Sequence, residues 1–238
     1  MKILLIGYGK MGQLIEELAL KKGHEITAKI NSKNSLNLLS VNPRNIDVAL
    51  EFSKPETVVE NVKWCLDKQI PVVIGTTGWQ GYKKEIDDYC HNLKGTYFFA
   101  SNFSIGVNLF FKLNEQLAKK LNSFDDYEPS ITEIHHTNKL DAPSGTAITL
   151  AEGILGNLER KTKWTNSESS STKAIHISSK RIDPTPGTHT VTYDSPIDQI
   201  EIKHTAHSRL GFAKGALLVA EWIVDKKGVL SMDDFLTP

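Results

Sequence analysis

The sequence predicts an α/β protein in which a doubly wound parallel sheet is followed by an α+β domain with a mixed sheet. Two observations predict this architecture. Short apolar runs alternate with helical patterns over the first part of the chain, whereas three strand-like runs in the second part follow one another without helices between them. The alternation is typical of a parallel sheet covered by helices, and the cluster of strands is typical of a separate sheet.

The first strand is the apolar run at residues 2–6, which suits a parallel strand buried on both faces. Gly7, Gly9 and Gly12 follow it in the pattern G-x-G-x-x-G, and a helical stripe begins at Met11. Strand, glycine turn and helix in this order form the dinucleotide fingerprint of a Rossmann-type sheet, because glycines let the backbone approach a pyrophosphate at a helix N-terminus. We therefore expect a dinucleotide cofactor at this turn.

The second strand, at residues 25–30, ends where such sheets carry an acidic residue that binds the ribose. This sequence has Asn31 there, with Lys33 close behind it. Without a carboxylate to repel a 2′-phosphate, NADPH should be tolerated. NADH is also compatible, because the Asn31 amide can hydrogen-bond a ribose hydroxyl. The sequence therefore predicts NADPH, NADH or both as the cofactor.

Three further strands complete the first sheet, and the loops after two of them carry small or polar residues. The strands are expected at residues 46–52, 71–74 and 96–100, with helices at residues 54–66 and 79–91 between them. Gly75, Thr76 and Thr77 follow the fourth strand, and Ser101 and Asn102 follow the fifth. The carboxyl edge of a parallel sheet is where ligands bind, and small side chains there admit a flat ring.

The pattern changes after Gly106. Helices are expected at residues 107–121 and 144–158, and strands at residues 130–135, 174–178, 188–193 and 199–204. The polar segment 161–173 is expected to form a loop. The last helix, at residues 212–224, is apolar almost all round, so it must be buried and is expected to return to the first domain. We accordingly predict one domain at residues 1–106 and 212–238 and a second at residues 107–211.

Composition and charge indicate which class of binding partner to expect. The 238 residues include 28 Lys and Arg and 28 Asp and Glu, so no global field favours nucleic acid or an anionic membrane. The N-terminal apolar run is too short for a signal peptide or a membrane span, which predicts a cytoplasmic protein. Cys65 and Cys90 stand apart without a CxxC spacing, so we expect reduced thiols and neither a disulfide nor a thiolate metal site. The expected ligand is a small molecule.

The densest group of chemically active residues lies at residues 133–147. His135 and His136 are followed by Lys139, and Ser144 opens an expected helix. A histidine with an ordinary pKa of about 6.5 can exchange protons near neutral pH, a lysine can hold or protonate a developing negative charge, and a helix N-terminus can cradle a carboxylate. Because neighbouring strand residues point to opposite faces, the strand must end at the two histidines if both serve one site.

This stretch, together with residues along the whole chain, resembles the 4-hydroxy-tetrahydrodipicolinate reductase (dihydrodipicolinate reductase) family. The most specific part is the run His-His-x-x-Lys-x-Asp-Ala-Pro-Ser-Gly-Thr, from His135 to Thr146. The glycine turn, Gly75-Thr76-Thr77-Gly78, Asn102-Phe103-Ser104 and Gly106-Val107-Asn108 are also similar. The resemblance implies reduction of 4-hydroxy-tetrahydrodipicolinate to tetrahydrodipicolinate by NADH or NADPH, in lysine and diaminopimelate biosynthesis. It also implies a Rossmann-type nucleotide domain and a substrate domain whose sheet mediates a homotetramer.

The site residues of that family fall on particular residues of this chain. The resemblance assigns proton transfer to His135 and Lys139, and contacts with the substrate carboxylates to His136, Ser144, Gly145 and Thr146. It assigns the cofactor to Gly7, Tyr8, Gly9, Lys10, Met11, Gly12, Asn31, Gly75, Thr76, Thr77, Ala100, Ser101, Asn102 and Phe103. Asp141 is expected to shape the loop, and no metal ion is implied. We hypothesise that hydride enters the ring of a cyclic dicarboxylate across an interdomain cleft, with protonation assisted by His135 and Lys139.

Two other interpretations are open at this point. A metal-dependent hydrolase or lyase could use His135, His136 and Asp141, although it would leave the N-terminal half unexplained. A catalytically silent nucleotide sensor would bind NADPH without oxidising it. The Arg-Gly-Gly pattern expected near Lys180 is absent, so the 180–187 loop lies outside the predicted site, and the roles of His204 and Arg209 are undetermined.

Overall fold

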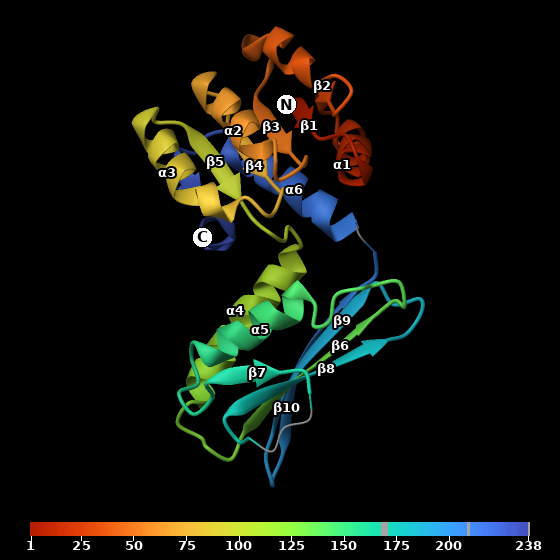
Figure 1. Ribbon diagram of the computed structural model, residues 1–238, viewed down its shortest axis with the longest axis vertical. Coiled ribbons are helices and arrows are strands. Elements are labelled where there is room, and N and C mark those ends of the chain that lie inside the picture. The colour runs from red at the N-terminus through yellow and green to blue at the C-terminus, as the bar shows by residue number, and fades with distance from the viewer. Residues whose placement is uncertain (168–170, 209, 238) are drawn as a thin grey trace. The chain divides into compact units, whose positions relative to one another are not determined.

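The computed structural model describes residues 1–167, 171–208 and 210–237, and the chain divides into two units. The first unit comprises Met1–Ile105 and the chain from Leu210 onward, and the second is the chain between them. Each unit has its own sheet, as Figure 1 shows. Among the helices of the described residues, none is long and apolar enough to cross a membrane.

The first unit contains a six-stranded parallel sheet, which confirms the predicted Rossmann-type fold. The strand order is β11-β5-β4-β3-β1-β2, and its five described pairings are all parallel. The strands are β1 (Lys2–Ile6), β2 (Glu25–Ile30), β3 (Val48–Glu51), β4 (Val72–Ile74), β5 (Thr96–Phe99) and β11 (Gly228–Leu230). Only β11 has no counterpart in the sequence prediction, because its three residues give too short a pattern to distinguish a strand from a loop.

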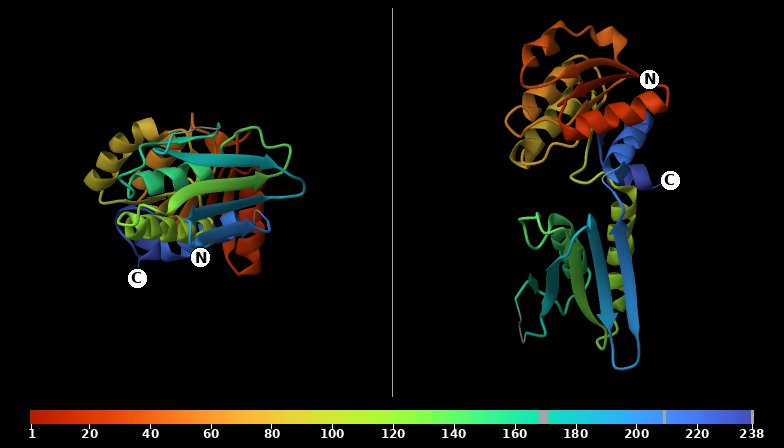
Figure 2. Two further views of the ribbon diagram at one scale, coloured as in Figure 1. Left: turned by 90° about the horizontal axis from the view of Figure 1, so that it is seen from below. Right: turned by 90° about the vertical axis from the view of Figure 1, so that its right-hand side faces the viewer.

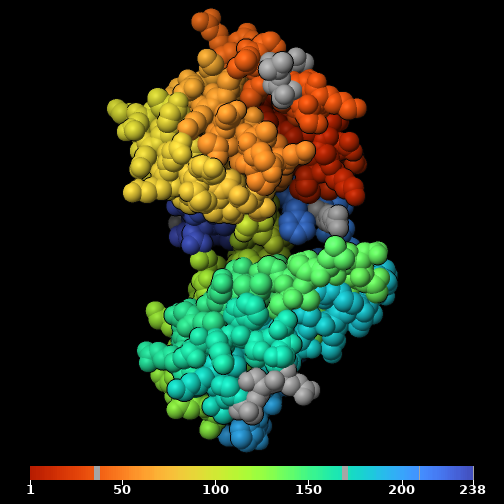
Figure 3. All heavy atoms as spheres, viewed as in Figure 1, coloured from red at the N-terminus to blue at the C-terminus, as the bar shows by residue number. Residues whose placement is uncertain are grey.

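Helices cover both faces of this sheet. α1 (Lys10–Lys21) and α6 (Leu210–Ile223) pack on the face that carries Ile3 and Leu5. α2 (Val58–Asp67) and α3 (Lys83–Asn92) pack on the opposite face, which carries Leu4 and Ile6 and is turned toward the viewer in Figure 3 (orange and yellow). Successive strand residues point to opposite faces, so one apolar run fills both cores. The remaining elements are α7 (Met232–Leu236), η1 (Ser35–Ser40), η2 (Pro43–Asn45) and η3 (Gln80–Tyr82).

The second unit contains a five-stranded mixed sheet, as predicted, in the order β10-β9-β6-β8-β7. The strands are β6 (Glu128–His135), β7 (Lys163–Thr165), β8 (Ala174–Arg181), β9 (Gly187–Asp194) and β10 (Gln199–Ala206). The central strand β6 runs antiparallel to β9 and parallel to β8. α4 (Ile105–Leu121) and α5 (Gly145–Leu155) lie on the same face of the sheet, and the opposite face is turned toward the viewer in the right-hand view of Figure 2.

The apolar face beneath these helices becomes polar at one end. Ile131 on β6 packs with Val191 on β9 and with Leu150 on α5. Glu133 and His135 continue the same buried face toward the end of β6. The end of the core that lies at the carboxyl end of β6 is therefore occupied by ionisable side chains rather than apolar ones.

The loop predicted at residues 161–173 is wrong at Lys163–Thr165, which forms β7 and pairs parallel with β8. Trp164 packs against the core of the second unit, and the edge of β8 offers backbone hydrogen-bonding groups that favour a paired strand over a solvated loop. Residues 168–170 of the predicted loop lie outside the described residues.

Candidate active site

The glycine turn after β1 has the geometry that the fingerprint requires. Gly7 has a φ of +93°, and a Cβ on it would lie 2.0 Å from the carbonyl oxygen of Phe52. A Cβ on Gly12 would lie 2.3 Å from the carbonyl oxygen of Gly7, whereas Gly9 has nothing within 4 Å of that position. Gly7 and Gly12 therefore permit close backbone packing, and Gly9 leaves open space at the N-terminus of α1 for a bound phosphate.

A cavity of about 640 Å³ opens at this turn. It is bordered by the carboxyl ends of β1, β2 and β3, the edge at which a parallel sheet binds ligands. Four predicted cofactor residues line it, namely Gly7, Tyr8, Gly9 and Asn31. The exposed Leu39 and the partly exposed Trp64 supply apolar surface. The residues present fit the adenosine and pyrophosphate parts of a dinucleotide.

Two local networks hold the walls of this cavity. The Tyr8 hydroxyl donates a hydrogen bond to Glu16 on α1, and Lys29 on β2 lies 3.0 Å from Glu16 and 4.9 Å from the centre of the Tyr8 ring. Asn31 caps a turn, because the Lys33 backbone N–H donates to its Oδ1 over 2.8 Å. The glycine turn and the end of β2 are thus held in place by side chains of the same unit.

The other predicted cofactor residues fall into two groups. Lys10, Met11 and Gly12 form the first turn of α1. Gly75–Thr77 and 100–103 follow the adjacent strands β4 and β5, whose carboxyl ends share one edge of the sheet. The Phe103 side chain is buried in the core beside Phe52 and Phe98. Only its backbone is in a position to contact a ligand.

Glu51 ties the β3 and β4 loops together, although sequence reasoning gave it no role. Thr76 Oγ1 donates to Glu51 Oε2 over 2.5 Å and accepts from the Ser53 backbone N–H over 2.8 Å. The Ser53 hydroxyl and the Asn61 amide also donate to Glu51. Burial of this fully enclosed carboxyl group raises its pKa, although these neutral donors oppose the rise.

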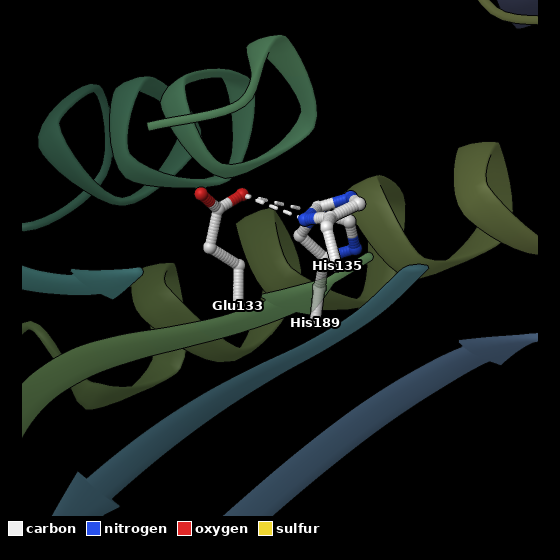
Figure 4. A group of neighbouring side chains, drawn as sticks. All are labelled: Glu133, His135 and His189. Carbon is white, nitrogen blue, oxygen red and sulfur yellow. Dashed lines mark ion pairs between the residues drawn. The ribbon is translucent and has the colours of Figure 1, made fainter. Parts of the chain in front are cut away.

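In the second unit, the end of β6 carries a buried cluster of one carboxylate and two imidazoles. Figure 4 shows the Glu133 carboxylate directed at the rings of His135 and His189. Its Oε2 lies 3.5 Å from His135 Nδ1 and 3.6 Å from His189 Nε2. The two rings meet edge to face with centroids 5.0 Å apart. All three side chains are buried.

This environment changes the acid–base behaviour expected for His135. Burial, and then the neighbouring His189, lower the pKa of His135 to about 4, although Glu133 opposes the shift. The imidazole is therefore neutral near pH 7 in the unliganded protein. Burial raises the pKa of Glu133, but the contacts from His189 and Ser144 outweigh it and hold the pKa well below its usual range. Glu133 is consequently ionised.

β6 ends at His135, as expected, and the loop that follows is organised by Arg181. Lys139 Nζ lies 2.8 Å from Asp141 Oδ1. Arg181 at the end of β8 donates to the carbonyl oxygens of Asp141 and Lys139 over 2.6 and 3.3 Å, and its Nη1 lies 3.5 Å from Glu133 Oε1. Arg181 belongs to the 180–187 segment that sequence reasoning left outside the site, yet it contacts the predicted site loop.

α5 begins beside the cluster. Ser144 is its N-cap and accepts a hydrogen bond from the Ala147 N–H over 3.2 Å. The Ser144 N–H donates to both Glu133 oxygens over 3.1 and 3.2 Å, and its hydroxyl lies 3.0 Å from His189 Nε2. Gly145 and Thr146 form the first turn, where N–H groups and the helix dipole favour an anion.

The remaining candidates lie around this group. His136 follows the end of β6 and is half-buried. His204 stacks on Phe110 with ring centroids 6.2 Å apart and abuts Gly106, where a Cβ would lie 3.1 Å from its Nε2. That contact gives His204 a packing role against α4. Arg209 lies outside the described residues.

One group of side chains among the described residues could hold a metal ion, and it comprises Glu133, His135 and His189. Their possible ligand atoms lie within 4.8 Å of one another. This group shares only His135 with the metal site considered from the sequence. The Arg181 guanidinium beside Glu133 already supplies positive charge there, which disfavours a second cation.

A Rossmann-type sheet with a cavity at its glycine turn, and a buried histidine cluster beside a helix N-terminus, are features of nicotinamide-dependent oxidoreductases. Two family models match the chain. They are dihydrodipicolinate reductase, N-terminus, over residues 1–103 and dihydrodipicolinate reductase, C-terminus, over residues 106–236. The chain therefore belongs to the dihydrodipicolinate reductase family.

Individual relatives agree with this assignment. A protein from Christiangramia forsetii named 4-hydroxy-tetrahydrodipicolinate reductase is 46% identical over 237 residues, which cover 100% of this chain and 98% of that protein. The dipicolinate-bound dihydrodipicolinate reductase from Paenisporosarcina sp. TG-14 has a TM-score of 0.81 and 24% identity, over 99% of each chain. Aspartate dehydrogenase from Thermotoga maritima has a TM-score of 0.51 and 17% identity, over 95% of this chain and 97% of that one. The two structures bear on the fold alone.

Proposed function

We propose that this chain reduces 4-hydroxy-tetrahydrodipicolinate to tetrahydrodipicolinate with NADPH or NADH, as a step of lysine and diaminopimelate biosynthesis. The observation that carries the proposal is the match to both family models over residues 1–103 and 106–236. The full-length relative at 46% identity, which is named for this activity, supports it. So does the Rossmann-type sheet, because such sheets bind the cofactors that donate hydride.

The first unit is proposed to hold the cofactor. Backbone N–H groups of residues 8–12 would bind the pyrophosphate, and the Asn31 Nδ2 group would donate to the adenosine ribose. The loops at Gly75–Thr77 and 100–103 would contact the nicotinamide, which supplies the hydride when the reduced cofactor is bound. A mixed preference for NADPH and NADH is expected, since the residue that follows β2 is Asn31 and not a carboxylate.

The second unit is proposed to hold the cyclic dicarboxylate. The first-turn N–H groups of α5, at Gly145 and Thr146, are the strongest candidates for one carboxylate, together with His136 and the hydroxyl of the N-cap Ser144. Lys139, held beside Asp141, would place a cation near the ring. His135 would exchange a proton with the substrate. Two incoming negative charges would favour the protonated imidazole, so substrate binding would draw a proton onto a histidine that is neutral in the unliganded protein.

We further propose a homotetramer that works in the cytoplasm, where its nicotinamide cofactors are reduced. The support for assembly is the sheet face opposite α4 and α5, which no helix in the described part of the second unit covers. Ser130 and Thr132 on β6 and Thr190 and Thr192 on β9 lie on this face and are half-buried, which suits stacking against another sheet. Neither nucleic acid nor a membrane has a role in this proposal.

A coupled assay tests the function. Dihydrodipicolinate synthase would generate the substrate in the cuvette, and the loss of nicotinamide absorbance would be followed with NADPH and with NADH. The proposal predicts oxidation that depends on the synthase product and survives exhaustive chelation. Binding of NADPH without such oxidation would instead indicate a nucleotide sensor. Loss of activity on chelation would indicate a metal-dependent enzyme.

A further inference from the structure

We propose that Glu133 and His189 are positioning residues for His135. The Glu133 carboxylate holds the proton on His135 Nδ1, which leaves His135 Nε2 to exchange a proton with the substrate. The role of Nε2 rests on the proposed function. The tautomer assigned to His135 does not, because the protein alone determines it.

The geometry of the sheet brings the side chains of Glu133, His135 and His189 together. Glu133 and His135 are two residues apart on β6, so both point to the same face. Glu133 is the direct partner of His189 in the antiparallel pairing of β6 with β9, and directly opposed side chains on one face are close neighbours. One carboxylate oxygen therefore meets an imidazole from its own strand and another from the next strand.

The surroundings of His135 Nδ1 favour a proton on that atom. In the described part of the chain, Nδ1 is buried and has no hydrogen-bond partner. The Oε2 atom of the ionised Glu133 carboxylate lies 3.5 Å from it. A proton on Nδ1 lies beside negative charge, whereas a bare Nδ1 lone pair would face a carboxylate. A small movement of either side chain closes the hydrogen bond, so the Nδ1–H tautomer is the stable neutral form.

The opposite edge of the imidazole is kept open by a glycine. A Cβ on Gly187 would lie 3.1 Å from His135 Nε2 and 3.3 Å from Cδ2. A side chain at this position would therefore crowd the atom that must exchange a proton. Gly187 opens β9, two residues before His189, so one strand supplies both the neighbouring imidazole and the open space.

Glu133 also connects His135 to the proposed carboxylate site. It accepts two hydrogen bonds from the Ser144 N–H, and the Ser144 hydroxyl lies 3.0 Å from His189 Nε2. Arg181, with Nη1 3.5 Å from Glu133 Oε1, balances the carboxylate charge on its other side. The carboxylate thus fixes the imidazole relative to the first turn of α5, and a shift in one would shift the other.

The first test needs no substrate. Long-range ¹H–¹⁵N spectra of histidine rings distinguish the two neutral tautomers, and His135→Gln identifies the signal of His135. The proposal predicts the Nδ1–H tautomer for His135 near pH 7, and an appreciable share of Nε2–H in Glu133→Gln. An Nε2–H tautomer in the unmodified protein would overturn it. So would a zinc-dependent change of these signals at equimolar Zn²⁺, which would make the cluster a metal site.

The second test separates positioning from general stability. Glu133→Gln should lower kcat by about 10- to 100-fold, the usual loss on removing an outer residue that orients a functional histidine, and should leave the KM for NADPH within about twofold. Because the Glu133 charge raises the pKa of His135, its loss should move the limb of the kcat/KM profile that His135 sets to lower pH. Glu152→Gln, an exposed glutamate on α5, is the matched control and should change neither quantity.

Two further variants guard against a folding artefact. His189→Asn should reproduce the fall in kcat if Glu133→Gln fails to fold, and Gly187→Ala should lower kcat while His135 keeps its Nδ1–H tautomer. A fall in kcat for Glu133→Gln with an unmoved pH profile and tautomer would reduce Glu133 to a structural role and overturn the proposal. If the unmodified protein lacks reductase activity, the tautomer measurement still decides the part of the proposal that concerns Glu133.

Discussion

Glu51 and Glu133 are both buried carboxyl groups at or near the carboxyl end of a sheet strand, yet their surroundings differ. The donors around Glu51 are neutral, namely the hydroxyls of Ser53 and Thr76 and the Asn61 amide. Glu133 faces two imidazoles, a guanidinium and a backbone N–H. The pKa of Glu51 is accordingly raised and that of Glu133 lowered.

The different surroundings indicate that Glu51 supports loops, whereas Glu133 acts on a residue of the proposed chemistry. A carboxyl group among neutral donors serves to hold the surrounding backbone. The hydrogen bonds of Glu51 connect the loops after β3 and β4, which border the proposed cofactor site. A carboxylate held ionised beside a histidine fixes the tautomer and the charge of that histidine. Changes near Glu133 should therefore affect turnover most, and changes near Glu51 should affect pH-dependent stability and cofactor affinity.

The largest effect is expected for His135→Gln, which removes the proton-exchanging ring at the Glu133 end of the comparison. Turnover should fall by about 10²- to 10⁴-fold, the usual worth of general acid–base catalysis, while the KM for the dicarboxylate changes less. Steady-state kinetics in the coupled assay measure both. His91→Gln, which removes an exposed histidine of α3, is the control. Unchanged turnover in His135→Gln would remove the histidine from the chemistry.

The next largest loss of turnover is expected for Lys139→Gln. Comparison with Asp141→Asn tests whether turnover depends on the Lys139 ammonium group or on its ion pair with Asp141. Turnover should fall by about 10- to 100-fold if the ammonium group stabilises developing charge or donates a proton. Asp141→Asn should change turnover by less than about fivefold, because the Asp141 side chain is 60% exposed and exposed ion pairs are weak. Equal losses in the two variants would show that the ion pair itself is what the site needs.

A smaller effect is expected for Ser144→Ala. The loss of the N-cap should cost about 1 kcal/mol of stability and should raise the KM for the dicarboxylate several-fold, because the first turn of α5 would fray. Thermal unfolding and substrate titrations measure these quantities. Thr149→Ala removes an exposed hydroxyl that donates within the same helix and should leave KM unchanged. An unaltered KM in Ser144→Ala would argue against carboxylate binding at this turn.

The smallest effect on turnover, within about twofold, is expected for Glu51→Gln. The pH dependence of stability should distinguish Glu51 from Glu133 more clearly than turnover does. The raised pKa of Glu51 means that the folded state holds its proton more tightly. The unmodified protein should therefore lose stability relative to Glu51→Gln as pH rises above about 4.5.

Glu133 should behave in the opposite way. Its pKa is lowered, so the unmodified protein should lose stability relative to Glu133→Gln as pH falls below about 4.5. Urea unfolding at a series of pH values measures both differences. The same sign of pH dependence for both variants would contradict the opposite pKa shifts of Glu51 and Glu133.

The strands and helices were predictable where the pattern was long and locally consistent. β1 was predicted at residues 2–6, as found, because a buried parallel strand has a continuous apolar run between turn signals. β2 was predicted at residues 25–30, as found, because Gly23 ends the preceding helix and a polar turn follows Ile30. β7 was missed because tertiary pairing with β8 and the packing of Trp164 overrode a polar local sequence. β11 was missed because its existence depends on the free edge of β5.

The predicted site was incomplete for a different reason. Glu133 was within reach of sequence reasoning, since a residue two before His135 on a strand shares its face. His189 and Arg181 were not, because their places beside Glu133 and His135 depend on the registers of β9 and β8 against β6. No local pattern encodes a register between strands that are distant in the sequence.

The most direct test of the central claim is the fate of the hydride. NADPH deuterated at C4 would be mixed with the synthase product and the protein, and the dicarboxylate product analysed by mass spectrometry. We expect the product to gain the mass of deuterium with the unmodified protein, and far more slowly with His135→Gln. Oxidation of the cofactor without deuterium in the dicarboxylate would contradict it.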